Sequence, residues 1–146
     1  MSEKKSLPTR VVDRMYNNDS FSKWLGIERI EDGVGSSILR MAVRKEMLNG
    51  FDIAHGGITY SLADSALAFA SNSHGIQSVS IETSISHTKP VKEDDILTAK
   101  AIEKNLTNKV GVYEIEVKNQ NDEIVALFKG TVYRTGKEWK VDKDKG

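Results

Sequence analysis

The alternation of apolar and polar residues along the chain predicts six β-strands. In the segment 113–118, Tyr113, Ile115 and Val117 alternate with charged residues, which is typical of a strand with one buried face. Five further segments show a similar alternation or a run of strand-forming residues: 25–30, 37–44, 79–86, 96–103 and 124–134. Most neighbouring segments are separated by short polar turns, so we expect an antiparallel sheet.

Two other segments carry a helical pattern. Residues 8–18 place apolar side chains on one face and polar side chains on the other, which predicts a short amphipathic helix. The helix predicted within 49–75 has no polar stripe, because its apolar residues point in nearly every direction: Ile58, Leu62, Ala63, Ala66, Leu67, Phe69 and Ala70. Such a helix has to be covered on nearly every side. We therefore expect an α+β fold in which one sheet curls around this helix, or a second subunit that covers what the sheet leaves bare.

Composition and charge narrow the classes of function. The chain has 146 residues, which fits one domain, and 21 basic residues balance 21 acidic ones. The zero net charge gives no electrostatic argument for binding nucleic acid or an anionic membrane surface. The lack of cysteine excludes disulfides and thiol nucleophiles, and no two of the three histidines are four residues apart, as a helical metal site requires. Because the sequence shows no secretion signal and no membrane-spanning run, we expect a cytoplasmic protein. Because it has no cysteine and no histidine pair at helical spacing, we expect no bound metal.

The sequence His-Gly-Gly stands at 55–57, immediately before the apolar helix. Gly56 and Gly57 have no Cβ, so a ligand can approach their backbone closely. If the helix begins there, their N–H groups lack intrahelical partners and can stabilise developing negative charge, such as the oxyanion of an acyl-transfer reaction. The alternative is a glycine pair that only turns the chain into the helix.

Asp64 lies within this helix among leucine and alanine residues. Aspartate is a poor helix former, and a buried carboxylate needs polar partners. A carboxylate in dry surroundings is a candidate general base or nucleophile. The alternative is a structural group that neighbouring hydroxyl side chains satisfy.

The spacing between Gly57 and Asp64 connects the two observations. They are seven residues apart, so they share a helix face but lie about 10 Å from each other along the axis. One chain cannot bring both groups to one carbonyl carbon. Two antiparallel copies of the helix about a two-fold axis bring one chain's Gly57 beside the other chain's Asp64. If both residues serve one reaction, we expect a homodimer with two shared sites.

Three motifs together resemble a known family. The pattern MLNG at 47–50, HGG at 55–57 and LADSA at 62–66 is similar to that of the hotdog-fold acyl-CoA thioesterases, in particular the phenylacetate-degradation thioesterase group. The segment 110–134 resembles the final hairpin of that group, and the resemblance covers roughly residues 20–134. It implies a curved antiparallel sheet wrapped around one long central helix, in dimers that often pair into homotetramers.

The resemblance also implies roles for the residues of the motif. The Gly57 amide binds the oxyanion, and Asp64 of the other chain acts as the nucleophile or the general base. Asn49 orients the thioester or the attacking water. His55 and Gly56 contact the substrate, with the alternative that His55 only caps the helix.

Several further positions are weaker candidates. In related thioesterases a serine assists the water, and Ser80 in the segment VSIE at 79–82 corresponds to it. The alternative for Ser80 is a merely polar strand face. Lys89, Lys92 and Arg134 are candidates for holding the phosphates of coenzyme A, with a solvated surface as the alternative for each.

The sequence therefore predicts a thioesterase that hydrolyses acyl-CoA, with coenzyme A as part of the substrate and no retained cofactor. Aryl-acetyl groups such as phenylacetyl, hydroxylated relatives, and short or medium acyl chains all remain open. The alternatives are a non-catalytic acyl-CoA sensor and, less consistent with the motif, a hotdog dehydratase or hydratase. A Ser-His-Asp hydrolase is disfavoured because no G-x-S-x-G motif is present. We expect a helical segment at 1–19, the hotdog domain at 20–135 and a charged, flexible tail at 136–146.

Overall fold

The structure, a computed structural model, describes residues 4–141. In this part of the chain the helices are α1 (Leu7–Asn17), α2 (Ser20–Leu25) and α3 (Gly56–Asn72), with a 3₁₀ turn at Lys45–Met47. The strands are β1 (Glu28–Gly33), β2 (Ser36–Ala42), β3 (Ile76–His87), β4 (Ile96–Leu106), β5 (Val110–Lys118) and β6 (Ile124–Glu138). The element order agrees with the order predicted from the hydrophobic pattern, except that α2 was not predicted.

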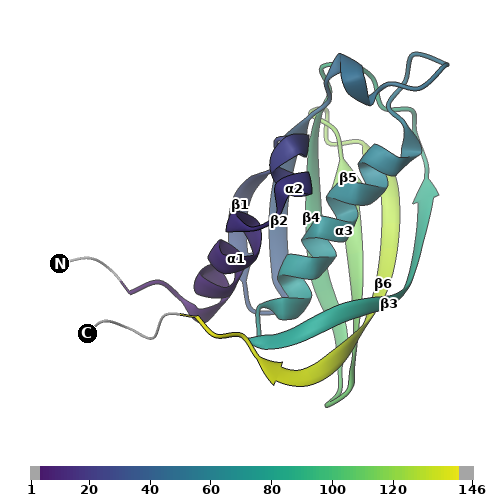
Figure 1. The fold of residues 1–146 in the computed structure, drawn as a ribbon. Coiled ribbons are helices and arrows are strands. Elements are labelled where there is room, and N and C mark those ends of the chain that lie inside the picture. Colours follow the sequence, from purple (N-terminus) through teal and green to yellow (C-terminus); the bar gives the residue numbers. More distant parts are fainter. Residues whose placement is uncertain (1–3, 142–146) are drawn as a thin grey trace.

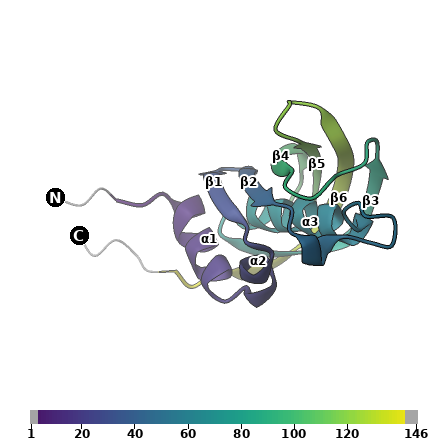
Figure 2. The same cartoon turned by 90° about the horizontal axis from the view of Figure 1, so that it is seen from above.

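The strands form one antiparallel sheet in the order β1-β2-β4-β5-β6-β3. This sheet curves around α3, as Figure 1 shows from the side and Figure 2 from above. α1 and α2 lie beside α3 at the β1 side of the sheet. The predicted α+β hotdog fold, a curved antiparallel sheet around one long helix, is therefore confirmed.

The core lies between α3 and the concave face of the sheet. Leu62, Ala63 and Ala66 of α3 are fully buried there. Close packing of the helix depends on Gly130 in β6, because a Cβ at this position would lie 2.4 Å from Cδ2 of Leu67. A glycine inside a strand otherwise weakens it, so its place here is explained by the approach of the helix.

α2 was missed because it is only six residues long and its apolar residues follow no extended period. Its ends are nevertheless well capped. The Asp19 side chain accepts a hydrogen bond from the Ser22 N–H at the start, and Gly26 adopts the left-handed conformation at the end. The strand predicted at 25–30 therefore begins later, at Glu28, and continues to Gly33.

The C-terminal strand is longer than its pattern predicted. β6 continues through Gly136 to Glu138, so the predicted domain boundary at residue 135 falls inside it. Beyond the strand, the Trp139 indole N–H donates to Asn72 Oδ1 at 2.8 Å, and the Trp139 backbone N–H donates to the Gly75 carbonyl at the same distance. These bonds attach the beginning of the predicted tail to the end of α3. Residues 142–146 of that tail lie outside the described residues.

β3 is one of the two edge strands of the sheet. It is twelve residues long, and only one of its sides is paired, with β6. Val79 and Ile81 on this strand are 55% and 61% exposed, which is unusual for β-branched residues in a sheet. An open edge with exposed apolar side chains is a template for pairing with a second strand.

Candidate active site at the start of helix α3

α3 begins at Gly56, with His55 as its N-cap residue. The His55 Nδ1 accepts a hydrogen bond from the Gly57 N–H at 2.9 Å, so the imidazole satisfies one of the free donors of the helix start. This is the capping role that the sequence left open for His55. The Gly56 N–H makes no hydrogen bond to a described residue. At this helix start, the unpaired amide is therefore that of Gly56, whereas the sequence interpretation selected Gly57.

Asn49 and Gly56 line the same cavity, which measures about 330 Å³. The Asn49 Oδ1 accepts hydrogen bonds from the backbone N–H groups of Phe51 and Ile53, at 2.9 and 3.4 Å, and so shapes the loop before the helix. The Nδ2 group of Asn49 donates to no described residue, which leaves it available to a ligand. His87, at the end of β3, lines the same cavity, with its Nε2 atom 3.2 Å from the place where a Cβ on Gly56 would stand.

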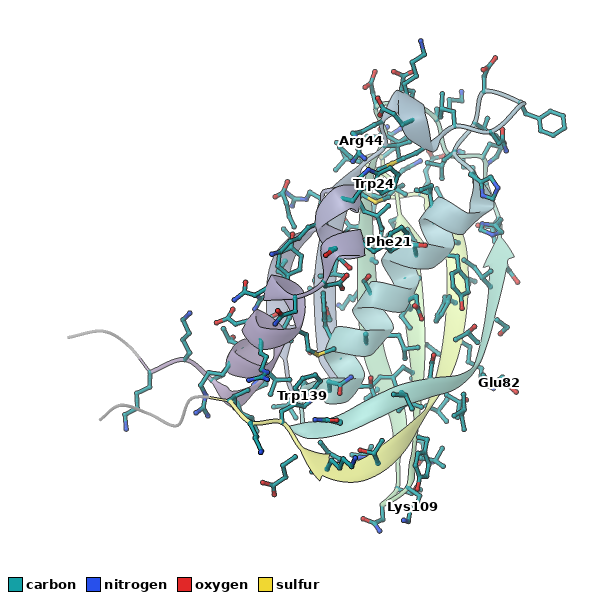
Figure 3. All side chains as sticks on the ribbon, in the orientation of Figure 1. Phe21, Trp24, Arg44, Glu82, Lys109 and Trp139 are labelled. Atoms are coloured by element: carbon teal, nitrogen blue, oxygen red, sulfur yellow. The ribbon has the colours of Figure 1, made fainter. Side chains whose placement is uncertain are left out.

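His55 and Gly57 face a second cavity, of about 400 Å³. Phe21 and Trp24 of α2 also line it, and so does Ser61, one helical turn beyond Gly57. Figure 3 shows the labelled Phe21 and Trp24 beside the N-terminal half of α3. The helix start therefore divides the predicted residues between two cavities: Asn49 with Gly56 in one, and His55 with Gly57 in the other.

Asp64 lies in the middle of α3 and is half-buried. Burial raises the pKa of this carboxyl above the ordinary aspartate value, and the negative charge of Asp19 acts in the same direction. No described residue donates a hydrogen bond to the Asp64 side chain or forms an ion pair with it. An unpaired carboxylate with a raised pKa is suited to accept a proton.

A short hydrogen-bond chain fixes α2 next to Asp64. The Ser22 hydroxyl donates to Asp19 Oδ2 at 2.6 Å, and it lies 2.8 Å from the Ser65 hydroxyl of α3. Ser65 is thus engaged with α2 rather than with Asp64. The contact places the aromatic residues of α2 beside the stretch of α3 that carries the site.

The single chain keeps the two principal groups apart. Gly56 and Asp64 are separated by eight residues of continuous α-helix, which corresponds to a rise of about 12 Å. Their atoms therefore do not meet at one point within one chain, as the predicted spacing required.

The weaker candidates lie away from these cavities or have other partners. Ser80 is exposed on β3 and lines neither cavity. Lys89 forms an ion pair with Glu123, and Arg134 donates to a backbone carbonyl in the β4–β5 turn. The side chain of Lys92 is exposed.

Within residues 4–141, no group of three or more histidine, cysteine or acidic residues is arranged to hold a metal ion. No helix in the same range is long and apolar enough to cross a membrane.

The sequence interpretation missed His87, Phe21 and Trp24. His87 reaches Gly56 only through the pairing of β3 with β6, which the hydrophobic pattern does not specify. The spacing of Phe21 and Trp24 could have indicated a short helix, because they are three residues apart and stand directly before Leu25. Two large aromatic side chains that remain about half exposed after folding are unusual, but this exposure is visible only in the structure.

Comparison with known proteins defines the class. A family profile described as the thioesterase superfamily matches residues 51–126, which include Asp64 and both glycines of the helix start. The chain belongs to this superfamily of hotdog enzymes and is a thioester hydrolase.

Individual relatives agree over most of the chain. The acyl-coenzyme A thioesterase PaaI of Escherichia coli is 42% identical over 122 residues, which are 84% of this chain and 87% of that protein. The structure of E. coli PaaI, from the phenylacetic acid degradation operon, superposes on this structure with a TM-score of 0.89. The match covers 90% of this chain and 96% of the E. coli chain. A protein of Archaeoglobus fulgidus is 44% identical over 138 residues, 94% of this chain and 90% of that protein. A Streptococcus mutans protein, solved bound to acetyl-CoA, has a TM-score of 0.75 with 27% identity and covers 77% and 91% of the two chains.

Proposed function

We propose that the protein hydrolyses acyl-CoA thioesters, including aryl-acetyl-CoA, at a site that two copies of the chain share. The observation that carries this proposal is a pair of groups on α3 that have no hydrogen-bond partner among residues 4–141: the Gly56 N–H at its start and the half-buried Asp64 carboxylate in its middle. The Gly56 amide is suited to stabilise a developing oxyanion, and the Asp64 carboxylate is suited to accept a proton. The relatedness to E. coli PaaI, an acyl-CoA thioesterase, supports this substrate class.

The shared site follows from the geometry of the helix. Eight residues of α3 hold Gly56 and Asp64 about 12 Å apart in one chain, so the two groups act together only across a dimer. The open edge of β3, with exposed Val79 and Ile81, supports pairing of the two copies along this strand. Two antiparallel β3 strands continue the sheet and bring the two copies of α3 side by side.

In the reaction, the thioester carbonyl oxygen accepts a hydrogen bond from the Gly56 N–H of one chain. Asp64 of the other chain either removes a proton from the attacking water or attacks the carbonyl carbon itself. The carbonyl oxygen becomes negative as the new C–O bond forms, and the amide at the helix start stabilises that charge. When the C–S bond breaks, coenzyme A leaves as the thiolate and takes up the proton that Asp64 removed from the water, or a proton from solvent after direct attack. Direct attack leaves the acyl group on Asp64 as a mixed anhydride, which a water molecule then hydrolyses to release the free acid and restore the carboxylate. Asn49, with its free Nδ2 group in the same cavity as Gly56, orients the thioester or the water.

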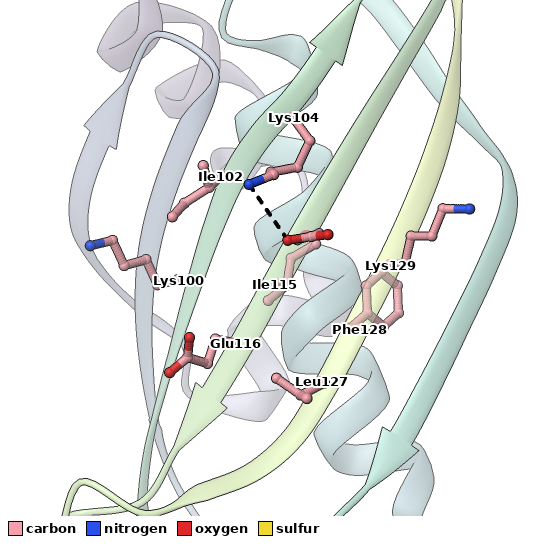
Figure 4. A pocket seen from close by; sticks show the side chains of 9 residues that line it. Lys100, Ile102, Lys104, Ile115, Glu116, Leu127, Phe128 and Lys129 are labelled. Atoms are coloured by element: carbon pink, nitrogen blue, oxygen red, sulfur yellow. Dashed lines mark ion pairs between the residues drawn. The ribbon is translucent and has the colours of Figure 1, made fainter.

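The outer face of the sheet is where we place the contact between two dimers in a homotetramer. A hollow of about 310 Å³ lies over β4, β5 and β6. Figure 4 shows the side chains that line it. Ile102 and Leu127, each 46% exposed, lie there among lysine and glutamate residues, and Lys104 forms an ion pair with Glu114 at 3.8 Å. Because both signs of charge occur on this face, two copies of it can pair with each other. Light scattering of the purified protein measures the mass that decides between dimer and tetramer.

Thiol release from a panel of acyl-CoA esters tests the function. We expect turnover of phenylacetyl-CoA, hydroxyphenylacetyl-CoA or short aliphatic esters in the presence of a chelator, since the proposed chemistry uses no metal and no retained cofactor. The matched control is Asp64→Asn, which keeps the shape of the side chain. If folded protein binds these esters but hydrolyses none of them, the sensor alternative replaces the enzyme.

A further inference from the structure

We propose that His87, the last residue of β3, is a further catalytic residue: its imidazole Nε2 donates a second hydrogen bond to the thioester carbonyl oxygen, beside the Gly56 N–H. This inference rests on the proposed hydrolysis of acyl-CoA and goes beyond it. It assigns to the oxyanion site a side-chain donor that lies outside the sequence motif at the helix start.

The imidazole of His87 stands against the start of α3. Its Nε2 atom lies 3.2 Å from the place that a Cβ on Gly56 would occupy, and its Cε1 atom lies 3.4 Å from the same place. A Cβ stands about 2.5 Å from the nitrogen of its own residue, so His87 Nε2 and the Gly56 nitrogen are at most about 5.7 Å apart. Two hydrogen bonds of about 2.9 Å span up to about 5.8 Å, so one oxygen atom can accept from both groups.

The His87 side chain is available for this bond. Among residues 4–141, no group forms a hydrogen bond or an ion pair with its imidazole. Its backbone is held by pairing with Ala126 of β6, and the following Thr88 N–H donates to the Val125 carbonyl at 2.9 Å. Because no described partner fixes the tautomer, the neutral ring can carry its proton on Nε2, and the charged ring carries one there in any case.

The cavity that His87 shares with Gly56 collects polar groups that lack partners. The Asn49 Nδ2 group and the Gly56 N–H have no partner among the described residues. The hydroxyl of Thr59, which lines the same cavity, also has none, although this residue is only 2% exposed. A buried hydroxyl without a partner costs stability, and a polar ligand offsets that cost. The reacting carbonyl is the part of the substrate that fits such a surface.

The proposed bond acts on charge and transfers no proton. As the new C–O bond forms, the carbonyl oxygen becomes negative, and the His87 N–H and the Gly56 N–H stabilise it together. When the C–S bond breaks, the oxygen is neutral again, and His87 keeps its proton throughout. Because the bond is strongest in the transition state, its loss should lower kcat and leave KM nearly unchanged.

Two substitutions separate hydrogen-bond donation from the other possible roles of the ring. His87→Phe keeps a ring and removes the donor, so we expect kcat for the best ester of the panel to fall about 10²-fold. Its KM should change less than about twofold. His87→Gln places an N–H at a similar distance from the backbone but cannot protonate a leaving group, and its kcat should stay within about fivefold of wild type. The control is Ser86→Ala, at an exposed neighbouring position of β3 that lines neither site cavity.

Infrared spectroscopy gives a second readout that does not require turnover. The probe is a ketone analogue of phenylacetyl-CoA, in which a methylene group replaces the sulfur and the carbonyl is isotopically labelled. Hydrogen bonds to a carbonyl oxygen lower its stretching frequency. The frequency of the bound ketone should therefore be higher in His87→Phe than in wild type, and it should return towards the wild-type value in His87→Gln.

Several outcomes would overturn the inference while leaving the hydrolysis intact. Equal losses of kcat in the two variants would indicate proton transfer or a structural role for His87, and full activity in His87→Phe would show that no second donor is needed there. An unchanged carbonyl frequency would place the ring away from the oxygen, and a changed mass of His87→Phe in light scattering would assign it to a subunit contact. If wild type hydrolyses no ester, the proposed function fails, and the carbonyl frequency alone decides whether His87 contacts the carbonyl. If the ketone does not bind to wild type either, both proposals fail.

Discussion

At the scale of single residues, the environment of Asp64 links its proposed catalytic role to the stability of the fold. Burial disfavours its charged form, and no described residue compensates with a hydrogen bond. The folded chain therefore binds the Asp64 proton more tightly than the unfolded chain does. As the pH rises from the ordinary aspartate value through the raised pKa, ionisation of Asp64 increasingly destabilises the folded state, and above that range the penalty is constant.

Asp64→Asn separates the two effects. The amide has the shape of the carboxylate without its charge, so we expect kcat to fall about 10²- to 10⁴-fold, as for loss of a general base. The same variant should melt at a higher temperature than wild type at pH 7, and this gain should vanish at a pH below the ordinary aspartate pKa, where both forms are neutral. Thermal unfolding at the two pH values measures it. Near-normal turnover, or a lower melting temperature at pH 7, would indicate a structural role for Asp64.

Asp19→Asn tests the second cause of the raised pKa. Asparagine is as good an N-cap as aspartate, so α2 should remain intact. Removal of the Asp19 charge lowers the pKa of Asp64, because the repulsion of two like charges disappears. The acid limb of the pH profile of kcat/KM should therefore move to lower pH, with the plateau unchanged. Asp94→Asn, at an exposed loop position whose left-handed backbone suits asparagine, is the control and should leave the limb in place.

At the scale of elements, the start of α3 distinguishes the two amides that are candidates for the oxyanion donor. His55 occupies the Gly57 N–H and leaves the Gly56 N–H free. Proline is well tolerated in the first turn of a helix, and the extended backbone of His55, with ψ of 136°, suits a residue that precedes proline. Proline can thus remove the Gly56 amide at little cost to the helix. Position 57 also lies in the first turn, but there proline follows the helical Gly56 and costs more.

We expect Gly56→Pro to lower kcat about 10²- to 10³-fold, as for loss of one oxyanion donor. Gly57→Pro should retain most of the activity, because its amide is already engaged by His55. The control for the added bulk is Gly56→Ala, which keeps the N–H and meets only the movable imidazole of His87. Circular dichroism verifies the fold of each variant. If Gly57→Pro loses more activity than Gly56→Pro, the oxyanion donor is the Gly57 amide.

Most helices and strands, but not all of their ends, could be predicted from the sequence. Periodicity located α1 and the strands β2, β4, β5 and β6 because each buries one face, and β1 and β3 were located by their strand-forming residues although neither contains a buried position. The apolar helix predicted the curved sheet that covers it. The end of β6 was missed because Lys137 and Glu138 are polar and exposed, and their strand conformation comes from pairing with β3, which hydrophobicity does not record. The motif named Asp64, Asn49 and the glycine pair as candidates, and that assignment stays a prediction. Which of the two adjacent amides lacks a partner among the described residues follows from the hydrogen bond of His55 to Gly57, which the sequence does not show.

At the scale of the whole molecule, the proposed site exists only in an assembly. Mixed dimers test this directly. A dimer of one Asp64→Asn chain and one Gly56→Pro chain contains one site with both groups intact and one with neither. We expect each parent to be nearly inactive and the purified heterodimer to approach about half of wild-type activity.

Differently tagged chains allow the heterodimer to be isolated after gentle dissociation and remixing. The control is a heterodimer in which both tagged chains carry Asp64→Asn, which should recover nothing. Folded, verified heterodimers as inactive as their parents would contradict the shared site and require separate roles for Gly56 and Asp64.

The open edge of β3 has a further consequence, for solubility. Before it forms the proposed dimer, a folded chain exposes twelve residues of strand edge, together with Val79 and Ile81, to every other extended segment in its surroundings. Such an edge aggregates unless it is paired or guarded by charge. Variants that only weaken the dimer should therefore be lost from solution as precipitate before they can be isolated as monomers. Ile81→Lys should instead yield a soluble, inactive monomer, because the charge that blocks pairing also protects the edge.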